Sequence, residues 1–190
     1  MASACFCFLR SLSWNLIGSE GAAALAPALT ATGALTSLDL SNNALCGVAQ
    51  DLFGRVSGTY TAEGITAIMD SLRVNGGLTV ANLLRNELDA ESAKMLAEVA
   101  KQKCISLCGI QRDQATADFC DKRLQPPDAI LLASDLSQAV VTGGLTSLDL
   151  SSNQLCLWNL HCRGHHSGCR RSACQWRADG PEFVVQLPQG

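Results

Sequence analysis

Hydrophobic residues recur along this chain in one fixed frame, L-x-x-L-x-L-x-x-N-x-L. Residues 33–46 fit the frame, and residues 143–156 repeat that segment almost unchanged. Residues 78–88 form a third copy with alanine at one leucine position, and weaker copies lie near 104–110 and 117–124. The two leucines of L-x-L point to the same side of a strand, because side chains alternate between its faces. Each copy therefore predicts a short strand with one buried face.

An asparagine follows the strand in each of the three clear copies, at Asn43, Asn86 and Asn153. A short amide at a chain turn can bond to backbone groups that would otherwise stay unpaired. If the copies stack side by side, the three amides form a ladder along one seam. The alternative is three unrelated surface turns, which leaves the leucine frame around each asparagine unexplained.

The segments between the strands predict helices. Their apolar residues recur at i, i+3 and i+7, which places each set on one helical face. Ser19, Thr61 and Asp89 are the expected N-caps of the first three helices, and the Pro126–Pro127 pair opens the fourth. Pro27 is expected to kink or shorten the first. The four apolar sets are Ala22, Leu25 and Leu29; Ile65, Ile68 and Leu72; Ala93, Leu96 and Ala100; and Ala129, Leu132 and Leu136.

The helix spacing indicates the length of the repeat. The step from Glu63 to Glu91 is 28 residues, which suits one strand plus one helix. The steps before and after are longer, and their extra residues fall near 46–60 and near 109–116. We interpret both segments as insertions that project from the repeats.

A known family shares these features. The 28-residue unit, the strand Leu-Thr-Ser-Leu-Asp-Leu-Ser-x-Asn-x-Leu and the Glu-Gly-Ala-x-x-Leu helix beginning at Glu20 resemble the ribonuclease-inhibitor-like leucine-rich repeat family. The same repeats occur in Ran GTPase-activating proteins and in the sensor regions of NOD-like receptors. The resemblance implies an α/β solenoid, a short horseshoe with parallel strands on its concave face and helices on its convex face. The activity it implies is holding a protein partner, and we expect no cofactor.

The resemblance divides the chain into three parts. We expect an irregular segment at 1–17, a leucine-rich repeat domain at 18–156 and a disordered tail at 157–190, where the composition changes in mid-repeat. Such an abrupt change is also typical of a truncated or misread gene product. Repeat stacks need polar caps at both ends. The last strand, 145–155, is therefore expected to leave an apolar edge, and the chain to be marginally stable or to self-associate through its uncapped repeat ends.

Stacked strands would align their fifth positions in one column on the concave face. That column holds Asp39, Asn82, Asp118 and Asp149. A partly acidic surface favours a protein partner with basic groups, so charge reversal of Asp39 and Asp149 is expected to weaken binding. The alternative is that these polar side chains only keep an exposed sheet face soluble. The expected partner-binding residues are Asp39, Ser41, Asn42, Asn82, Leu84, Arg85, Asp118, Asp121, Asp149, Ser151 and Ser152.

Candidates for catalysis are few. Arg85 is the only arginine in a well-formed repeat strand, and a GTPase activator uses an arginine finger. A solvated or partner-contacting arginine is the favoured interpretation, because no loop setting for a finger is recognisable. All three histidines lie after residue 156, so a His–Asp–Ser or Cys–His arrangement has no rigid platform. We therefore expect a protein that is not an enzyme.

The tail carries side chains that can bind a metal. Their spacing offers neither C-x-x-C nor the separated Cys and His pairs of a zinc finger. A tail without metal is favoured, and zinc binding is the alternative. The side chains concerned are His161, Cys162, His165, His166, Cys169 and Cys174.

Composition narrows the function further. Of the 190 residues, 47% are hydrophobic and 16% charged, which supplies a core and argues against wholesale disorder. A formal charge of −3 argues against nucleic-acid binding. No uninterrupted apolar run approaches the roughly 18 residues of a membrane span, so no membrane partner is expected. Ten cysteines would suggest disulfides in a small secreted protein, but five of them sit singly in or beside apolar runs, as small buried hydrophobic residues do. This placement and the absence of a clear signal peptide predict reduced thiols in the cytoplasm.

Overall fold

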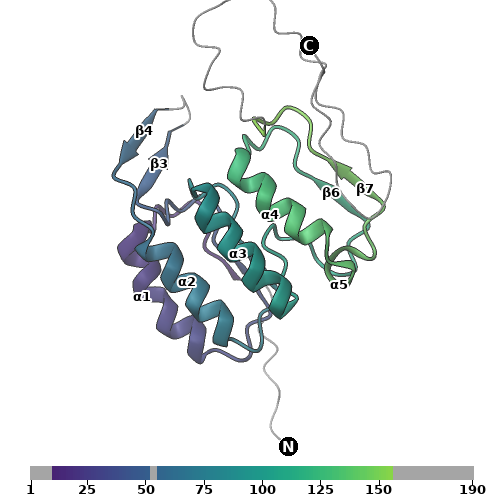
Figure 1. Ribbon diagram of the computed structural model, residues 1–190, viewed down its shortest axis with the longest axis horizontal. Helices are drawn as coiled ribbons and strands as arrows, with labels where there is room; N and C mark the ends of the chain where they lie inside the picture. Colours follow the sequence, from purple (N-terminus) through teal and green to yellow (C-terminus); the bar gives the residue numbers. More distant parts are fainter. Residues whose placement is uncertain (1–9, 52–54, 156–190) are drawn as a thin grey trace, which may run out of the picture. The chain divides into compact units, whose positions relative to one another are not determined.

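Short strands alternate with helices along the chain (Figure 1), which confirms the predicted mixed α/β class. The computed structural model describes residues 10–51 and 55–155, and these lie in one compact unit that ends at Leu155. The strands are β1 (Arg10–Ser11), β2 (Ser37–Asp39), β3 (Val48–Gln50), β4 (Val56–Gly58), β5 (Val80–Asn82), β6 (Thr116–Asp118) and β7 (Ser147–Asp149). The helices are α1 (Gly18–Ala31), α2 (Glu63–Val74), α3 (Ala90–Lys103), α4 (Pro126–Leu136) and α5 (Ala139–Thr142).

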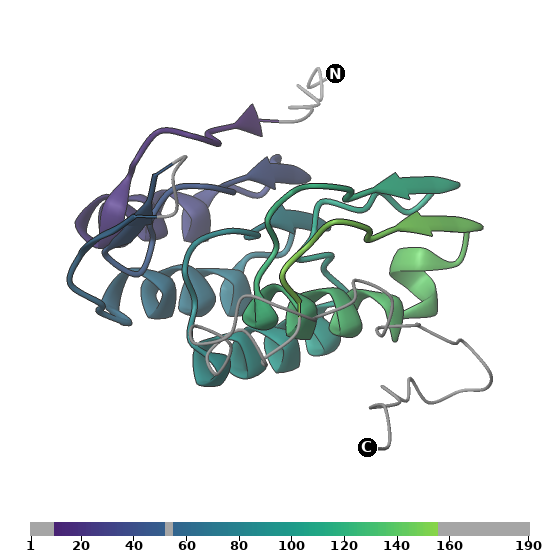
Figure 2. The ribbon, with the colours of Figure 1, turned by 90° about the horizontal axis from the view of Figure 1, so that it is seen from above.

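The unit has two layers. Figure 2 shows strands β1, β2, β5, β6 and β7 along one side and helices α1–α4 along the other. Strands β1, β2 and β5 form a parallel sheet in which Asp39 lies opposite Asn82. A single further bridge joins Val80 to Ser106. Strands β6 and β7 form a separate parallel pair in which Asp118 lies opposite Asp149.

The single column of fifth positions predicted from the sequence is therefore interrupted. Among the described strands, β6 pairs with β7 and not with the first sheet. The chain stays hydrogen-bonded to the first sheet as far as Leu107, whose O accepts from Leu83 N–H at 2.9 Å. On the outer edge, the N–H groups of Leu107 and Cys108 donate to the Asp135 carboxylate at 2.8–3.0 Å. A side chain of α4 thus replaces the next strand as the hydrogen-bond acceptor at this edge.

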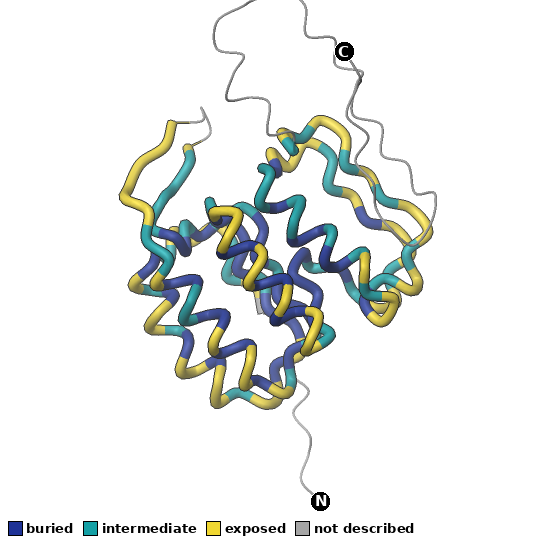
Figure 3. The backbone as a smooth tube through the Cα atoms, in the orientation of Figure 1, coloured by how far each residue is buried: buried dark blue, intermediate teal, exposed yellow. Residues whose placement is uncertain are grey.

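Leucines of the repeat frame fill the space between the layers. Leu38, Leu40 and Leu83 are at most 3% exposed, and each contributes about 1.5–3 kcal/mol by leaving water. Figure 3 shows buried residues where the helices face the strands. The apolar faces predicted for the first three helices are confirmed, with Leu25 only half-buried.

The buried face of the fourth helix only partly matches the predicted one. Of the predicted set, Leu132 is buried as expected and Ala129 and Leu136 are half-buried, whereas Asp128 and Asp135 are also buried. These two carboxylates, i and i+7 on α4, accept hydrogen bonds from backbone N–H groups. Asp128 accepts from Arg85 and Gln125 at 2.9 and 2.8 Å. The polar face is buried because it supplies acceptors that the neighbouring backbone lacks.

The N-terminal boundary also differs from the prediction. Residues 10–17 are not irregular but form another copy of the repeat: β1 pairs with β2, and Leu12 N–H donates to Asp39 O at 2.8 Å. Asn15 takes the asparagine position of this copy, since its N–H donates to Asn43 Oδ1 at 2.9 Å. Residues 1–9 and the predicted tail lie outside the described residues.

The helix starts follow the predictions in part. Asp89 caps α3, and its carboxylate accepts from Ser92 N–H at 2.7 Å. The prolines open α4 as expected. Ser19 is no cap: its hydroxyl accepts from Gly64 N–H at 3.1 Å and so joins α1 to α2. Pro27 lies inside α1, which nevertheless continues to Ala31.

The insertion near 46–60 forms a hairpin. Strands β3 and β4 pair antiparallel, with Val48 opposite Gly58. A Cβ at Gly58 would overlap the carbonyl oxygen of Gly47, and Gly58 has φ +97°, so only glycine fits. Both strands are half-buried or exposed, as expected of a projecting segment.

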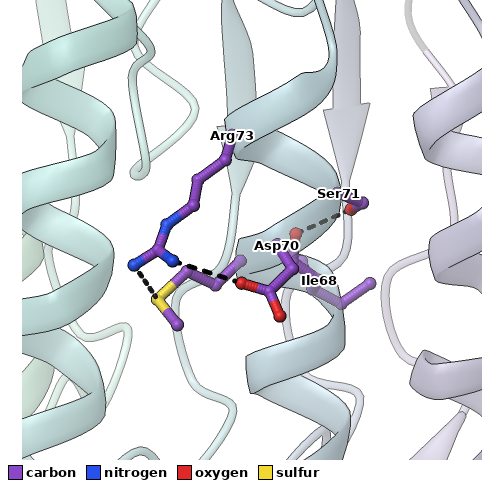
Figure 4. A network of polar contacts seen from close by, with 5 residues as sticks. Ile68, Asp70, Ser71 and Arg73 are labelled. Atoms are coloured by element: carbon purple, nitrogen blue, oxygen red, sulfur yellow. Dashed lines mark hydrogen bonds and ion pairs between the residues drawn. The ribbon is translucent and has the colours of Figure 1, made fainter.

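Pairs of oppositely charged side chains lie on the exposed outer face of the helices. On α2, the Arg73 guanidinium lies 3.4 Å from an Asp70 carboxylate oxygen and 4.0 Å from Met69 Sδ (Figure 4). Both charged side chains are more than half exposed, so the pair stabilises the protein by a few tenths of a kcal/mol at most.

Within the part that the structure describes, none of the helices has the length and apolar character needed to cross a membrane.

Candidate partner-binding face

The fifth-position side chain of every clear strand closes the turn that follows it. One carboxylate oxygen of Asp39 accepts from both N–H and Oγ–H of Ser41, at 2.9 and 2.7 Å. The same Asx turn recurs three times at the corresponding positions. The further pairs are Leu84 N–H to Asn82 at 3.3 Å, Cys120 N–H to Asp118 at 2.8 Å and Ser151 N–H to Asp149 at 2.8 Å.

These bonds shape the electrostatics of the strand ends. The Ser151 N–H and hydroxyl hold the pKa of the exposed Asp149 carboxyl below its ordinary value. Each aspartate uses one oxygen, Oδ1, for its turn, and the other takes part in no hydrogen bond within the described residues. Sequence reasoning identified these residues as a column but missed their role in the turn. The sequence did contain a sign of this role: each copy has an Asp or Asn at its fifth position, two residues before the residue whose N–H it accepts from.

Backbone geometry repeats at the same place. Five residues that follow the strands adopt a left-handed conformation, which is uncommon for residues other than glycine. They occupy one position of the frame, so this geometry belongs to the repeat itself. These residues are Trp14 (φ 61°), Asn42 (φ 56°), Arg85 (φ 58°), Asp121 (φ 53°) and Ser152 (φ 58°).

The asparagines behind the strand ends form a ladder over the first three copies. Asn43 N–H donates to Asn86 Oδ1 at 2.9 Å, and Asn15 N–H donates in turn to Asn43 Oδ1. The Asn86 amide donates to Leu40 O and Leu83 O at 3.0 and 2.9 Å. Asn43 and Asn86 are 0% exposed.

Asn153 makes the equivalent bonds in the second strand pair. Its amide donates to Phe119 O and Leu150 O, and its oxygen accepts from Leu124 N–H at 3.0 Å. The structure therefore joins Asn43 and Asn86 directly and places Asn153 in a separate group. Asn15 was missed by sequence reasoning, although Leu12, Asn15 and Ile17 fit the frame.

Arg85 is held by its neighbours. Its guanidinium carbon lies 5.3 Å from the centroid of the Trp14 ring, a cation–π contact. Burial, and next the nearby Arg123, lower the pKa of the Arg85 guanidinium. Burial and the charge of Asp128 raise the pKa of Glu87, whose carboxylate accepts from Gln125 Nε2 at 3.0 Å.

The remaining candidates divide by exposure. Ser41 and Leu84 are 7% and 4% exposed, so these two expected contact residues are buried within the repeat. Asn42 and Arg85 are half-buried. The exposed or half-buried side chains at the strand ends are termed the strand-end face. The strand-end face comprises Asp39, Asn42, Asn82, Arg85, Asp118, Asp121, Asp149, Ser151 and Ser152.

A hollow of about 280 Å³ adjoins this face. It lies between the first sheet and the chain from Cys108 to Phe119, where the two strand groups separate. Asp39 and Asp118, which the sequence placed in one column, line the hollow from opposite groups. The other lining residues are Ser37, Leu38, Val80, Asn82, Cys108, Gly109, Ile110, Gln111, Gln114, Ala117 and Phe119.

No metal cluster of three or more His, Cys, Asp or Glu side chains occurs within residues 10–51 and 55–155. The predicted alternative of a zinc-binding tail concerns His161 to Cys174, which lie outside the described residues.

Comparison with known proteins supports the repeat. A family model described as Leucine Rich Repeat matches residues 34–56, which include β2, its Asx turn and Asn43. No curated protein matches the chain. The chain therefore contains a leucine-rich repeat, the unit of domains that generally bind other proteins.

Proposed function

We propose that this protein is a non-catalytic scaffold, a short ribonuclease-inhibitor-like solenoid that binds a protein partner through the strand-end face. One observation carries the proposal: the same Asx turn fixes a polar side chain at the end of four strands. Side chains held in this way lose little conformational freedom when a partner binds, which lowers the cost of association.

The charge of the strand-end face supports a partner with basic groups. Four of its side chains are aspartates, at Asp39, Asp118, Asp121 and Asp149, and its arginine is stacked on Trp14. Complementary charge accelerates the encounter and fixes the orientation of two proteins.

The Asx turns decide how this proposal is tested. Charge reversal at Asp39 would break the bond to Ser41 as well as the interaction with a partner. Substitution of the aspartate by asparagine removes the charge and keeps this hydrogen bond, because Asn82 already closes the same turn after β5. Neutralisation to asparagine therefore separates the charge from the fold.

The triple variant Asp39→Asn, Asp118→Asn and Asp149→Asn is expected to bind a partner, captured and identified by cross-linking, about tenfold more weakly. This loss equals three exposed ion pairs of about 0.5 kcal/mol each. Titration calorimetry at low and high salt measures it, and the difference should shrink at high salt because exposed charges are screened.

The control removes charge from the helix side. Asp70→Asn with Glu98→Gln neutralises two exposed carboxylates on α2 and α3, each in a surface ion pair. Its affinity should equal that of the unmodified chain. Equal affinities for all three proteins would exclude the strand-end face as the binding surface.

We infer that Arg85 contributes to binding and not to GTP hydrolysis. An arginine finger enters the nucleotide site of another protein. Arg85 is instead half-buried and packs over the Trp14 ring, while its backbone N–H donates to Asp128. Withdrawing it would forfeit the ring contact.

We also propose a cytoplasmic location. Cys46, Cys104, Cys108 and Cys120 are free thiols, and Cys46 and Cys108 are buried. Burial raises the pKa of the Cys46 thiol to about 11, so it stays protonated and unreactive. Reduced cysteines of this kind are typical of intracellular proteins.

A further inference from the structure

The hollow between the two strand groups has the chemistry of a cation site. Its lining includes the acidic residues Asp39 and Asp118 and the amide residue Asn82. None of its lining residues is Lys, Arg or His. In the described part of the chain, neither aspartate takes part in an ion pair. The negative charge of the hollow is therefore left without a partner from its own lining.

A buried hydroxyl provides an independent indication of a ligand. Ser37 is 6% exposed and lines the hollow, on the same side of β2 as Asp39. Its Oγ has no hydrogen-bond partner within the described structure. Gln138 Oε1 is likewise unpaired, but Gln138 is not among the residues that line the hollow. Leaving a buried hydroxyl unpaired is unfavourable, and a bound donor would remove that penalty.

The size and walls of the hollow restrict the occupant. Its volume of about 280 Å³ lies below the range of about 300–1,000 Å³ typical of small-molecule pockets. Val80, Ile110 and Phe119 provide apolar surface beside the polar groups. A single long side chain, apolar along its stem and cationic at its tip, suits such a site.

We propose that the hollow receives an arginine side chain of the protein partner; this inference rests on the function proposed above. The planar guanidinium offers five N–H donors, enough to bond the free oxygens of Asp39 and Asp118 and the Ser37 hydroxyl together. Lysine offers a compact point charge with three donors, which matches this spread of acceptors less well.

The test titrates the full chain with N-acetyl-L-arginine methylamide and follows backbone amides by NMR. Saturable shifts are expected at Asn82, Gly109 and Gln111. The same titration with the neutral isostere N-acetyl-L-citrulline methylamide should give none. Equal shifts with the two probes, or no saturable shift with arginine, would overturn the proposal.

The variants form a matched set. Asp39→Asn with Asp118→Asn should weaken arginine binding by about fivefold or more, with the fold kept because asparagine supports the Asx turn. Asp149→Asn makes the same change in an identical turn outside the hollow lining and should leave the affinity unchanged. An equal loss of arginine affinity in Asp149→Asn would show that binding depends only on the net charge of the surface and not on the hollow, which would overturn the proposal.

Ser37→Ala supplies a second readout. It should weaken arginine binding without lowering the melting temperature, because the hydroxyl has no partner to lose. Unchanged arginine affinity in Ser37→Ala would exclude the hydroxyl and overturn the site as proposed.

The two proposals fail separately. If the triple variant loses the protein partner while the arginine probe binds nowhere, the arginine site proposed for the hollow is wrong and the proposed binding through the strand-end face is supported. If the probe binds in the hollow while the triple variant keeps its partner, the proposed function is wrong.

Discussion

At the scale of single residues, the repeat is held by amides and carboxylates that bond to the backbone. Asn86 joins two neighbouring copies of the frame: its oxygen accepts from Asn43 and Leu45 N–H, and its amide donates to Leu40 O. A buried turn has no water to satisfy these groups, so the side chain must do so. This requirement explains why one asparagine is retained in each clear copy.

Asn86→Ala is expected to lower the free energy of unfolding by roughly 3 kcal/mol, because several buried backbone groups lose their partners. Asn153→Ala is the matched control: it removes equivalent bonds from a half-buried turn and should cost about 1 kcal/mol, since water can replace them. Urea unfolding of both variants measures the difference. A similar loss in the two would contradict the role given to burial.

At the scale of the elements, α4 supplies the hydrogen-bond acceptors at the outer edge of the first sheet. Asp135 accepts from Ser106 Oγ and from the N–H groups of Leu107 and Cys108. Burial raises the pKa of the Asp135 carboxyl, and these hydrogen bonds oppose that rise. One side chain therefore satisfies the backbone donors at the edge where a further strand would otherwise pair.

Asp135→Asn is expected to destabilise the protein by about 2 kcal/mol, because the new NH₂ group faces donors instead of accepting from them. Hydrogen exchange should accelerate at the Leu107 and Cys108 amides before it does so at Val80. Asp113→Asn changes an exposed aspartate of the nearby loop and should leave the exchange rates unaltered. Unchanged protection of Leu107 in Asp135→Asn would show that the carboxylate does not hold this edge.

At the scale of the whole repeat unit, the two ends differ from the middle. Leu148 and Leu150 of the last copy are half-buried, whereas Leu38 and Leu40 of the second copy are buried. At the N-terminal end, Leu16 is 74% exposed. Stacked repeats bury each unit against the next, and within the described residues the first and last copies have a described neighbour on one side only.

The chain is expected to self-associate through these ends, and its mass in light scattering should rise with concentration. Leu16→Asn tests the N-terminal end, because φ is +50° there and asparagine tolerates this conformation. The variant should associate less and unfold at the same temperature. A monomer at every concentration with a sharp cooperative melt would contradict the prediction.

The local sequence was sufficient to predict the strands and helices, but it was not sufficient to predict how the strands group into sheets. The leucine frame predicted β2, β5 and β7, and the i, i+3, i+7 spacing predicted α1 to α3, because each pattern reports which side of an element is apolar. The same rule missed Asp128 and Asp135, since a charged residue is normally counted as exposed. Only their partners, Arg85 and Leu107, explain why they are buried.

The sequence by itself determined that this chain is a series of strand–turn–helix units, with an asparagine in each clear copy that bonds within its own turn. Those contacts span a few residues, so their pattern is visible in the order of the amino acids. The tertiary structure alone decided that the strands form two groups, that an N-terminal copy joins the first group, and that Asp39 and Asp118 face one hollow. These features depend on pairs 28 or more residues apart, such as Leu107 with Asp135 and Asn15 with Asn43, and no local pattern specifies such pairs.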